Sequence, residues 1–146
     1  MTAFTDDNLI VDTREGKVRG ARSGNTYRWL GIPYAAPPVG QLRYRAPQPP
    51  LKWDGVRDAL EFGSVAPQEA TKLIPIPAGL KIAEDCLSLN VWVPKAAATD
   101  GRKRPVMLWV HGGAYFIGFS AQPVYNGQAL ADEGDVIVIT INYRLG

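Results

Sequence analysis

A short glycine-rich segment, His111-Gly-Gly-Ala-Tyr115, follows an apolar run at residues 105–110. Amide N–H groups that converge on one point can stabilise the negative charge that develops on an oxygen during ester cleavage. Gly and Ala suit this task because larger side chains would obstruct the oxygen, and glycine permits backbone angles that turn amides inward. The segment therefore predicts an oxyanion-binding loop, and a plain Gly-Gly turn between a strand and a loop is the alternative.

His111 and Ser120 are the obvious candidates for a base and a nucleophile, and the sequence argues against both. His111 is the only histidine, and it stands directly beside the amide donors, whereas a base faces its nucleophile from another direction. We expect it to hold the glycine loop by hydrogen bonding. Ser120 lies in Gly118-Phe-Ser-Ala-Gln122, which lacks the second glycine and the preceding strand of a nucleophile elbow. We interpret it as a loop serine.

Cys86 is the single cysteine and follows Glu84 and Asp85. Neighbouring carboxylates disfavour a thiolate, so a structural role is predicted rather than a nucleophilic one. The two acids have no partner histidine, and we expect them to pair with arginines of the preceding coil.

The composition is that of an ordinary globular protein, with 46% apolar and 21% charged residues. The net charge is +2 and the basic residues are scattered, so nucleic acid is not an expected partner. One cysteine permits no internal disulfide and fits a reducing compartment. The start of the chain does not read as a secretory signal, and no apolar run is long enough for a membrane span. We therefore expect no membrane partner and a cytoplasmic location, although a chain whose signal had been removed would look the same.

Hydrophobic patterning predicts an α/β protein. The expected strands are 8–13, 16–20, 26–32, 87–93, 105–110 and 136–141. The first three should form a small antiparallel sheet, and residues 63–83 read as a long loop. The strands 105–110 and 136–141 are continuously apolar, which is typical of parallel strands covered on both faces. A helix over 126–133, capped by Asn126 and ended by Gly134, would join them into a right-handed βαβ unit.

Four segments, in order, resemble the type-B carboxylesterase family, the cholinesterase-like branch of the α/β-hydrolases. They are Gly31-Ile-Pro-Tyr-Ala-Ala-Pro-Pro-Val-Gly40 with Leu42-Arg-Tyr-Arg45, Glu84-Asp-Cys-Leu-Ser-Leu-Asn-Val-Trp92, Pro105 to Tyr115, and Asp135 to Gly146. The chain resembles in particular the compact bacterial members of the family, such as the para-nitrobenzyl esterases. The resemblance implies an α/β-hydrolase fold, of which residues 1–146 would be the N-terminal part of a single domain, incomplete at the C-terminus. That part comprises the small N-terminal sheet and the first strands of a mostly parallel central sheet.

The resemblance also implies roles for individual residues. Gly113 and Ala114 would donate their N–H groups to the oxyanion, and Gly112 would shape the loop. Tyr115 and Phe116 would line the substrate pocket. The third donor of the family follows the nucleophile, and no Gly-x-Ser-x-Gly motif occurs in this sequence.

Structural roles follow from the same resemblance. Arg43 and Glu84 match an ion pair that ties the proline-rich coil to the sheet, and the loop 63–83 would lie over the rim of the active-site gorge. Strand 136–143 should lie between 87–93 and 105–110. The free side of 105–110 should then pair with the strand that carries the serine, and an open apolar edge there invites aggregation of the chain alone.

The expected activity is that of a serine carboxylesterase, which hydrolyses a small-molecule carboxylic ester through an acyl-enzyme. No metal or organic cofactor is implied. The serine, acid and histidine would come from the remaining C-terminal part of the hydrolase, so the 146-residue chain alone should be inactive. Two alternatives stay open: a non-catalytic cholinesterase-like binding or adhesion module, and an inactive truncated fragment.

Overall fold

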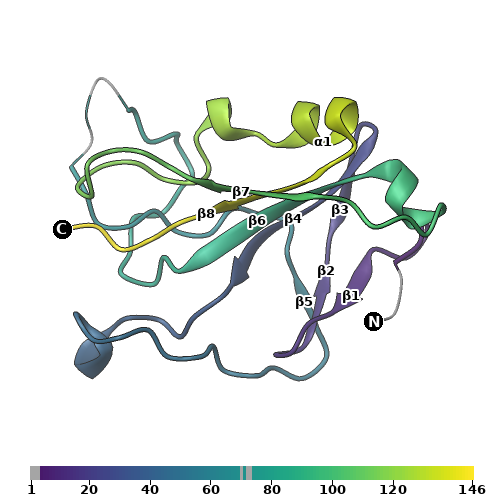
Figure 1. Ribbon diagram of the computed structural model, residues 1–146. Coiled ribbons are helices and arrows are strands. Elements are labelled where there is room, and N and C mark those ends of the chain that lie inside the picture. Colours follow the sequence, from purple (N-terminus) through teal and green to yellow (C-terminus); the bar gives the residue numbers. More distant parts are fainter. Residues whose placement is uncertain (1–3, 70, 72–73) are drawn as a thin grey trace.

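The computed structural model describes residues 4–69, 71 and 74–146, and its strands form two sheets (Figure 1). The smaller sheet has the order β1 (Ile10–Asp12), β2 (Lys17–Arg19) and β5 (Val56–Asp58). The larger sheet has the order β3 (Ala21–Ser23), β4 (Thr26–Pro33), β6 (Ser88–Pro94), β8 (Ile137–Ile141) and β7 (Val106–Val110). The helical elements are η1 (Gly40–Leu42), η2 (Lys95–Ala98), η3 (Pro123–Tyr125) and α1 (Gln128–Gly134).

The small sheet contains only the first two of the three strands that we predicted for it. β1 and β2 pair antiparallel, and β5 adds to β2 in parallel. The third predicted strand, 26–32, is β4 of the larger sheet, where β3 and β6 flank it. Both faces of β4 bury side chains, which explains why it lies inside a larger sheet. The short strand β3 escaped prediction because Ala-Arg-Ser carries little β-propensity.

Three strands of the large sheet have the order that the family resemblance implied. β8 lies between β6 and β7, and it pairs antiparallel with β6 and parallel with β7. The β3–β4 and β4–β6 pairings are also antiparallel, so the described part of this sheet is mixed. The parallel pair brings the C-terminal ends of β7 and β8 to the same edge, where the glycine loop begins.

Helix α1 covers one face of the large sheet (Figure 1). Ala131 is fully buried and packs in a cluster with Leu30, Trp92 and Val138. The predicted caps are shifted by one position. Asn126 accepts a hydrogen bond from the amide of Gln128 at 3.0 Å, although Gly127 occupies the cap position. The helix ends at Gly134, as predicted, and the residue that adopts the left-handed conformation after it is Asp135, with φ 50°.

Strand β7 differs from the expectation of a strand covered on both faces. All five of its residues, from Val106 to Val110, are 43–59% exposed. β8 alternates between half-buried and buried positions, as expected for a covered strand. Within the described part of the chain, β7 pairs only with β8, so its other edge carries unpaired backbone groups beside apolar side chains. Aggregation through this edge stays a prediction.

A buried arginine fixes the connection that enters β7. The Arg104 side chain is only 2% exposed, and its Nε lies 2.9 Å from Asp135 Oδ1. Its Nη2 lies 2.5 Å from Asp100 Oδ2. Hydrogen bonds from Arg104, and then from the Arg102 amide, lower the pKa of Asp100 to about 2.

We expect the Asp100 carboxylate to make stability depend on pH between about 4 and 2. Its pKa is 3.8 in the reference state and about 2 in the folded chain. The unfolded chain therefore binds more protons in this window, so the stabilisation is complete above pH 4 and is lost as the pH falls toward 2. The free energy of unfolding is measured by denaturant unfolding of the parent and of Asp100→Asn at pH 2 to 5. Plotted against pH, it should change less steeply for the variant than for the parent. Asp54→Asn serves as the control for loss of a surface charge. An equal pH dependence of the unfolding free energy in the parent and in Asp100→Asn would contradict the role given to the Asp100 carboxylate.

Candidate functional site

The glycine loop leaves the sheet directly after β7 and adopts an unusual backbone conformation. Gly113, Ala114 and Tyr115 have φ values of 129°, 51° and 66°. The amides of Phe116 and Ile117 both donate to the carbonyl of Gly113, each at 3.1 Å. Positive φ is unfavourable for residues with a side chain, and such strain persists only where the surroundings impose it. Three consecutive residues at positive φ, two of which carry a side chain, are closed by these two hydrogen bonds and make this loop a candidate site.

Two amides in this loop are left without an intramolecular acceptor. Among the residues that the structure describes, the N–H groups of Gly113 and Ala114 donate to no protein atom. Backbone donors in folded proteins are nearly always paired with protein or water. These two donors can therefore bind water or a ligand without breaking a hydrogen bond within the protein.

The two glycines of the loop have different steric requirements. A Cβ on Gly113 would overlap the carbonyl oxygen of Ile117, so no other L-residue fits there without movement. A Cβ on Gly112 would meet nothing within 4 Å among the described residues. The expectation that Gly112 shapes the loop therefore has no steric support here, and the space beside it is open.

His111 supports the loop in the way that the sequence predicted. It is 3% exposed, and its ring stacks on Tyr143 with centroids 4.3 Å apart. The Nδ1 atom of His111 lies 2.9 Å from the carbonyl oxygen of Gly112, and the Tyr143 hydroxyl donates to the carbonyl oxygen of His111 at 2.7 Å. Burial lowers the pKa of His111, and the contact with Gly112 opposes that shift. The neutral imidazole is thus favoured, and it joins the loop to the chain that follows β8.

Ser120 is a buried loop residue, as predicted. Its amide donates to Asn142 Oδ1 at 2.7 Å, and its hydroxyl accepts a hydrogen bond from Asn90 Nδ2 at 3.1 Å. Asn90 also donates to the hydroxyl of Thr140 at 2.9 Å. These bonds fasten the segment after the glycine loop onto β6 and β8, and they occupy the serine in a structural role.

Cys86 behaves as a structural residue, also as predicted. It is 1% exposed. Burial raises the pKa of its thiol to about 11, and the charges of Glu84 and Asp85 add to the shift. The thiol stays protonated near neutral pH, and a protonated, buried thiol is a poor nucleophile.

The remaining predicted residues lie at the surface. Tyr115 is 76% exposed and Phe116 is 61% exposed, so they line no enclosed pocket within the described residues. Arg43 Nε lies 3.0 Å from Glu84 Oε1, with both side chains partly exposed. Such an exposed pair contributes about 0–1 kcal/mol. The loop 63–83 contains no helix or strand where it is described; its residues 70, 72 and 73, like residues 1–3, lie outside the described residues.

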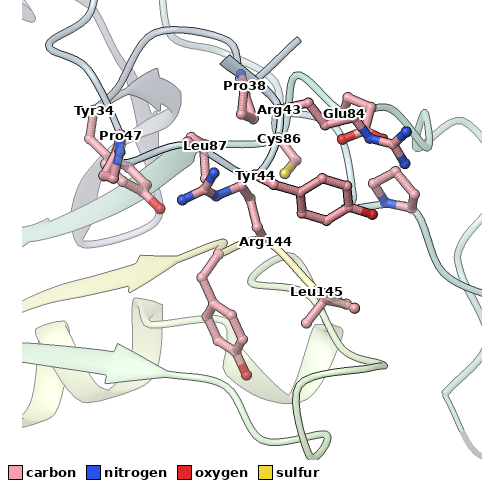
Figure 2. A pocket seen from close by; sticks show the side chains of 13 residues that line it. Tyr34, Pro38, Arg43, Tyr44, Pro47, Glu84, Cys86, Leu87, Arg144 and Leu145 are labelled. Carbon is pink, nitrogen blue, oxygen red and sulfur yellow. The ribbon is translucent and has the colours of Figure 1, made fainter. Parts of the chain in front are cut away.

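A hollow of about 690 Å³ lies between the proline-rich segment and the last residues of the chain (Figure 2). Its lining includes Tyr34, Pro38, Arg43, Tyr44, Pro47, Pro67, Glu84, Cys86, Leu87, Tyr143, Arg144, Leu145 and Gly146. The amides of Gly113 and Ala114 do not line it. Tyr143 borders the hollow and also contacts His111, so the two features are neighbours but separate.

The described residues form neither a metal-binding cluster nor a membrane-spanning helix. Within residues 4–69, 71 and 74–146, no three His, Cys, Asp or Glu side chains gather closely enough to hold a metal ion. No helix in that part of the chain has the length and apolar character that crossing a membrane requires.

Comparison with known sequences matches this chain to esterases. A family model described as "Carboxylesterase family" matches residues 7–146. The chain is 47% identical over 138 residues to the para-nitrobenzyl esterase of Bacillus subtilis (strain 168), covering 94% of this chain and 28% of that protein. It is 45% identical over 152 residues to the fumonisin B1 esterase of Sphingopyxis macrogoltabida, covering 100% of this chain and 26% of that protein.

Comparison with solved structures agrees. A para-nitrobenzyl esterase structure superposes with a TM-score of 0.88 and 46% identity, covering 94% of this chain and 28% of that chain. A carboxylesterase of Geobacillus stearothermophilus gives a TM-score of 0.83 at 46% identity, covering 95% of this chain and 27% of that chain. The predicted fold class, part of an α/β-hydrolase fold, is confirmed. The chain spans little more than a quarter of the length of these relatives.

Proposed function

Because this chain belongs to the carboxylesterase family, we propose that it supplies the oxyanion-binding part of a carboxylic ester hydrolase. One observation carries the proposal. The amides of Gly113 and Ala114 have no intramolecular acceptor in the described part of the chain, and they lie in a strained loop at the end of β7. Unpaired main-chain donors held in this way are what the transition state of acyl transfer requires.

The proposed reaction divides the chemistry between two segments. A serine outside these 146 residues attacks the ester carbonyl, and its proton passes to a histidine base of the same segment. The carbonyl oxygen becomes negatively charged, and the amides of Gly113 and Ala114 stabilise it. Collapse of the intermediate expels the alcohol, which takes the proton from the histidine. Water then hydrolyses the acyl-enzyme by the same steps and releases the acid.

In this proposal residues 1–146 are the N-terminal part of a single hydrolase domain. The exposed edge of β7 would receive the next strand of that domain, and its five apolar residues would then be covered. Tyr115 and Phe116 project from the loop, which would let them contact an apolar acyl or alcohol group. The substrate would be a small carboxylic ester, and the chemistry needs no cofactor.

A chimeric enzyme tests the proposal. In the chimera, this chain replaces the matching segment of the Bacillus subtilis para-nitrobenzyl esterase, to which it is 47% identical. We expect the chimera to hydrolyse a short-chain aryl ester, and an organophosphate to stop the reaction by trapping the serine. The 146-residue chain alone should show no turnover.

Two controls make the outcome decisive. A chimera whose nucleophilic serine is replaced by alanine should be inactive. Organophosphate-sensitive turnover by the 146-residue chain alone would overturn the proposal that the nucleophilic serine lies outside these residues. A chimera that folds as the parent esterase does, yet hydrolyses nothing, would instead favour the binding-module alternative.

A further inference from the structure

Gln68 makes an unusual contact with the segment that closes the glycine loop. Its Nε2 donates to the carbonyl of Gly118 at 2.8 Å, and its Oε1 accepts from the amide of Gly118 at 2.8 Å. The side-chain amide thus pairs with both backbone groups of one residue, 50 positions away in the sequence. Two hydrogen bonds to one residue restrict both its position and its orientation.

Gly118 is the point at which the loop is packed against its own base. Its φ is 112°, and a Cβ there would lie 2.5 Å from both the carbonyl oxygen of Gly112 and Nδ1 of His111. The preceding residue, Ile117, donates its amide to Gly113 at 3.1 Å. A residue that holds Gly118 in place therefore also holds the two ends of the turn that contains the free amides.

The side chain of Gln68 is itself held by the buried residues that precede it in the chain. Its Nε2 also donates to the carbonyl of Ala66 at 3.2 Å, so both of its amide hydrogens have acceptors. Ala66 and its neighbour Val65 are 2% and 0% exposed. Val65 is bonded to the far side of the loop 63–83, through Lys81 O at 2.7 Å and the amide of Ala83 at 2.9 Å.

We propose that Gln68 is a positioning residue for oxyanion stabilisation, an inference that rests on the proposed function. Gln68 touches neither the free amides nor a substrate. It acts by holding Gly118, and through Gly118 the turn from Gly113 to Ile117, in the conformation that presents the amides. The loop 63–83 thereby contributes to the rate of the reaction as well as to the shape of the molecule.

The chain contains a matched control for this residue. Gln48 makes the same local bond, from Nε2 to the carbonyl two residues earlier, Ala46 O, at 3.2 Å. Its side chain is exposed and lies outside the glycine loop. Gln48→Ala therefore removes an equivalent local bond without releasing Gly118. Gln68→Ala removes the contact to Gly118, and Gln68→Met removes its hydrogen bonds while keeping the length of the side chain.

Steady-state kinetics of the chimera give the first test. We expect Gln68→Ala and Gln68→Met each to lower kcat by about 10-fold or more, a smaller loss than removal of a whole donor, with KM little changed. The affinity for an aryl trifluoromethyl ketone, whose serine adduct carries an oxyanion, should fall by the same factor. Gln48→Ala should leave both quantities unchanged. Equal kcat values for the parent and the Gln68 variants would overturn the inference. So would a loss of kcat in Gln68→Ala that is absent in Gln68→Met.

Amide hydrogen exchange of the chimera gives a second test that does not depend on its activity. Gln68→Met should speed exchange in residues 112–118 and leave β4 and β6 unchanged. If the chimera is inactive but this local effect is seen, the proposed function fails while the hold on the loop stands. If the loop exchanges at the parental rate, or β4 and β6 change with it, the positioning role is wrong whatever the activity.

Discussion

Replacing Gly113 with alanine is expected to lower kcat of the chimeric esterase by about 10²–10³-fold, the loss that removal of one oxyanion donor produces. The substitution keeps the N–H group, so its effect must come through geometry. A Cβ would overlap the carbonyl oxygen of Ile117, and the φ of 129° is one that alanine rarely adopts. The turn must open to relieve both, and the amides of Gly113 and Ala114 then move together. Because the oxyanion forms only in the transition state, KM should change little.

The measurement is kcat and KM for an aryl ester, together with affinity for the aryl trifluoromethyl ketone. Gly134→Ala is the matched control, since a Cβ there would meet only Val136 at ordinary contact distances, 3.6 Å and beyond. It lies in the last turn of α1, far along the chain from the glycine loop, and should leave kcat unchanged. Parental kcat in Gly113→Ala would show that these amides do not carry the charge of the intermediate.

The strands of the large sheet could be predicted because their pattern is local. The alternation in 87–93 and the apolar runs 105–110 and 136–141 each correspond to an observed strand. The order of those strands was available only through the resemblance, since no local pattern records which strands are neighbours. The exposure of β7 could not be predicted from the same pattern, because apolar residues report burial in the whole assembled protein rather than in the part described here.

The site divides in a similar way. Gly113 stood out because its residue type and its place after an apolar strand both point to backbone donors. Gln68 gave no such signal. Its partner Gly118 is 50 residues distant, and nothing in the sequence around a single glutamine indicates a bond to a distant peptide group. The misplaced strand 26–32 has the same origin, because alternation identifies a strand but does not say which sheet it joins.

Phe119 shows how strongly the fold depends on the loop 63–83. Its side chain is fully buried in a cluster with Val65 and Ala121, and four partly buried residues, three of them from the loop 63–83, pack around it. Those partly buried residues are Phe62, Ile74, Ile76 and Leu80. This small core joins the end of the glycine loop to the segment that carries Gln68, so packing and the Gln68 hydrogen bonds act on the same junction.

Phe119→Ala is therefore expected to lower the free energy of unfolding by about 3–5 kcal/mol, the usual cost of deleting a buried phenylalanine. A typical domain has only about 5–15 kcal/mol in total, so the loss is large enough to unfold a marginal chain. Phe116→Ala is the matched control: this residue is 61% exposed and should change stability by no more than about 0.5 kcal/mol. Denaturant unfolding of both variants at neutral pH measures the difference. Similar values for the two would mean that the loop 63–83 is held by its backbone bonds and not by Phe119. Gln68 would then be the main link between that loop and the candidate site.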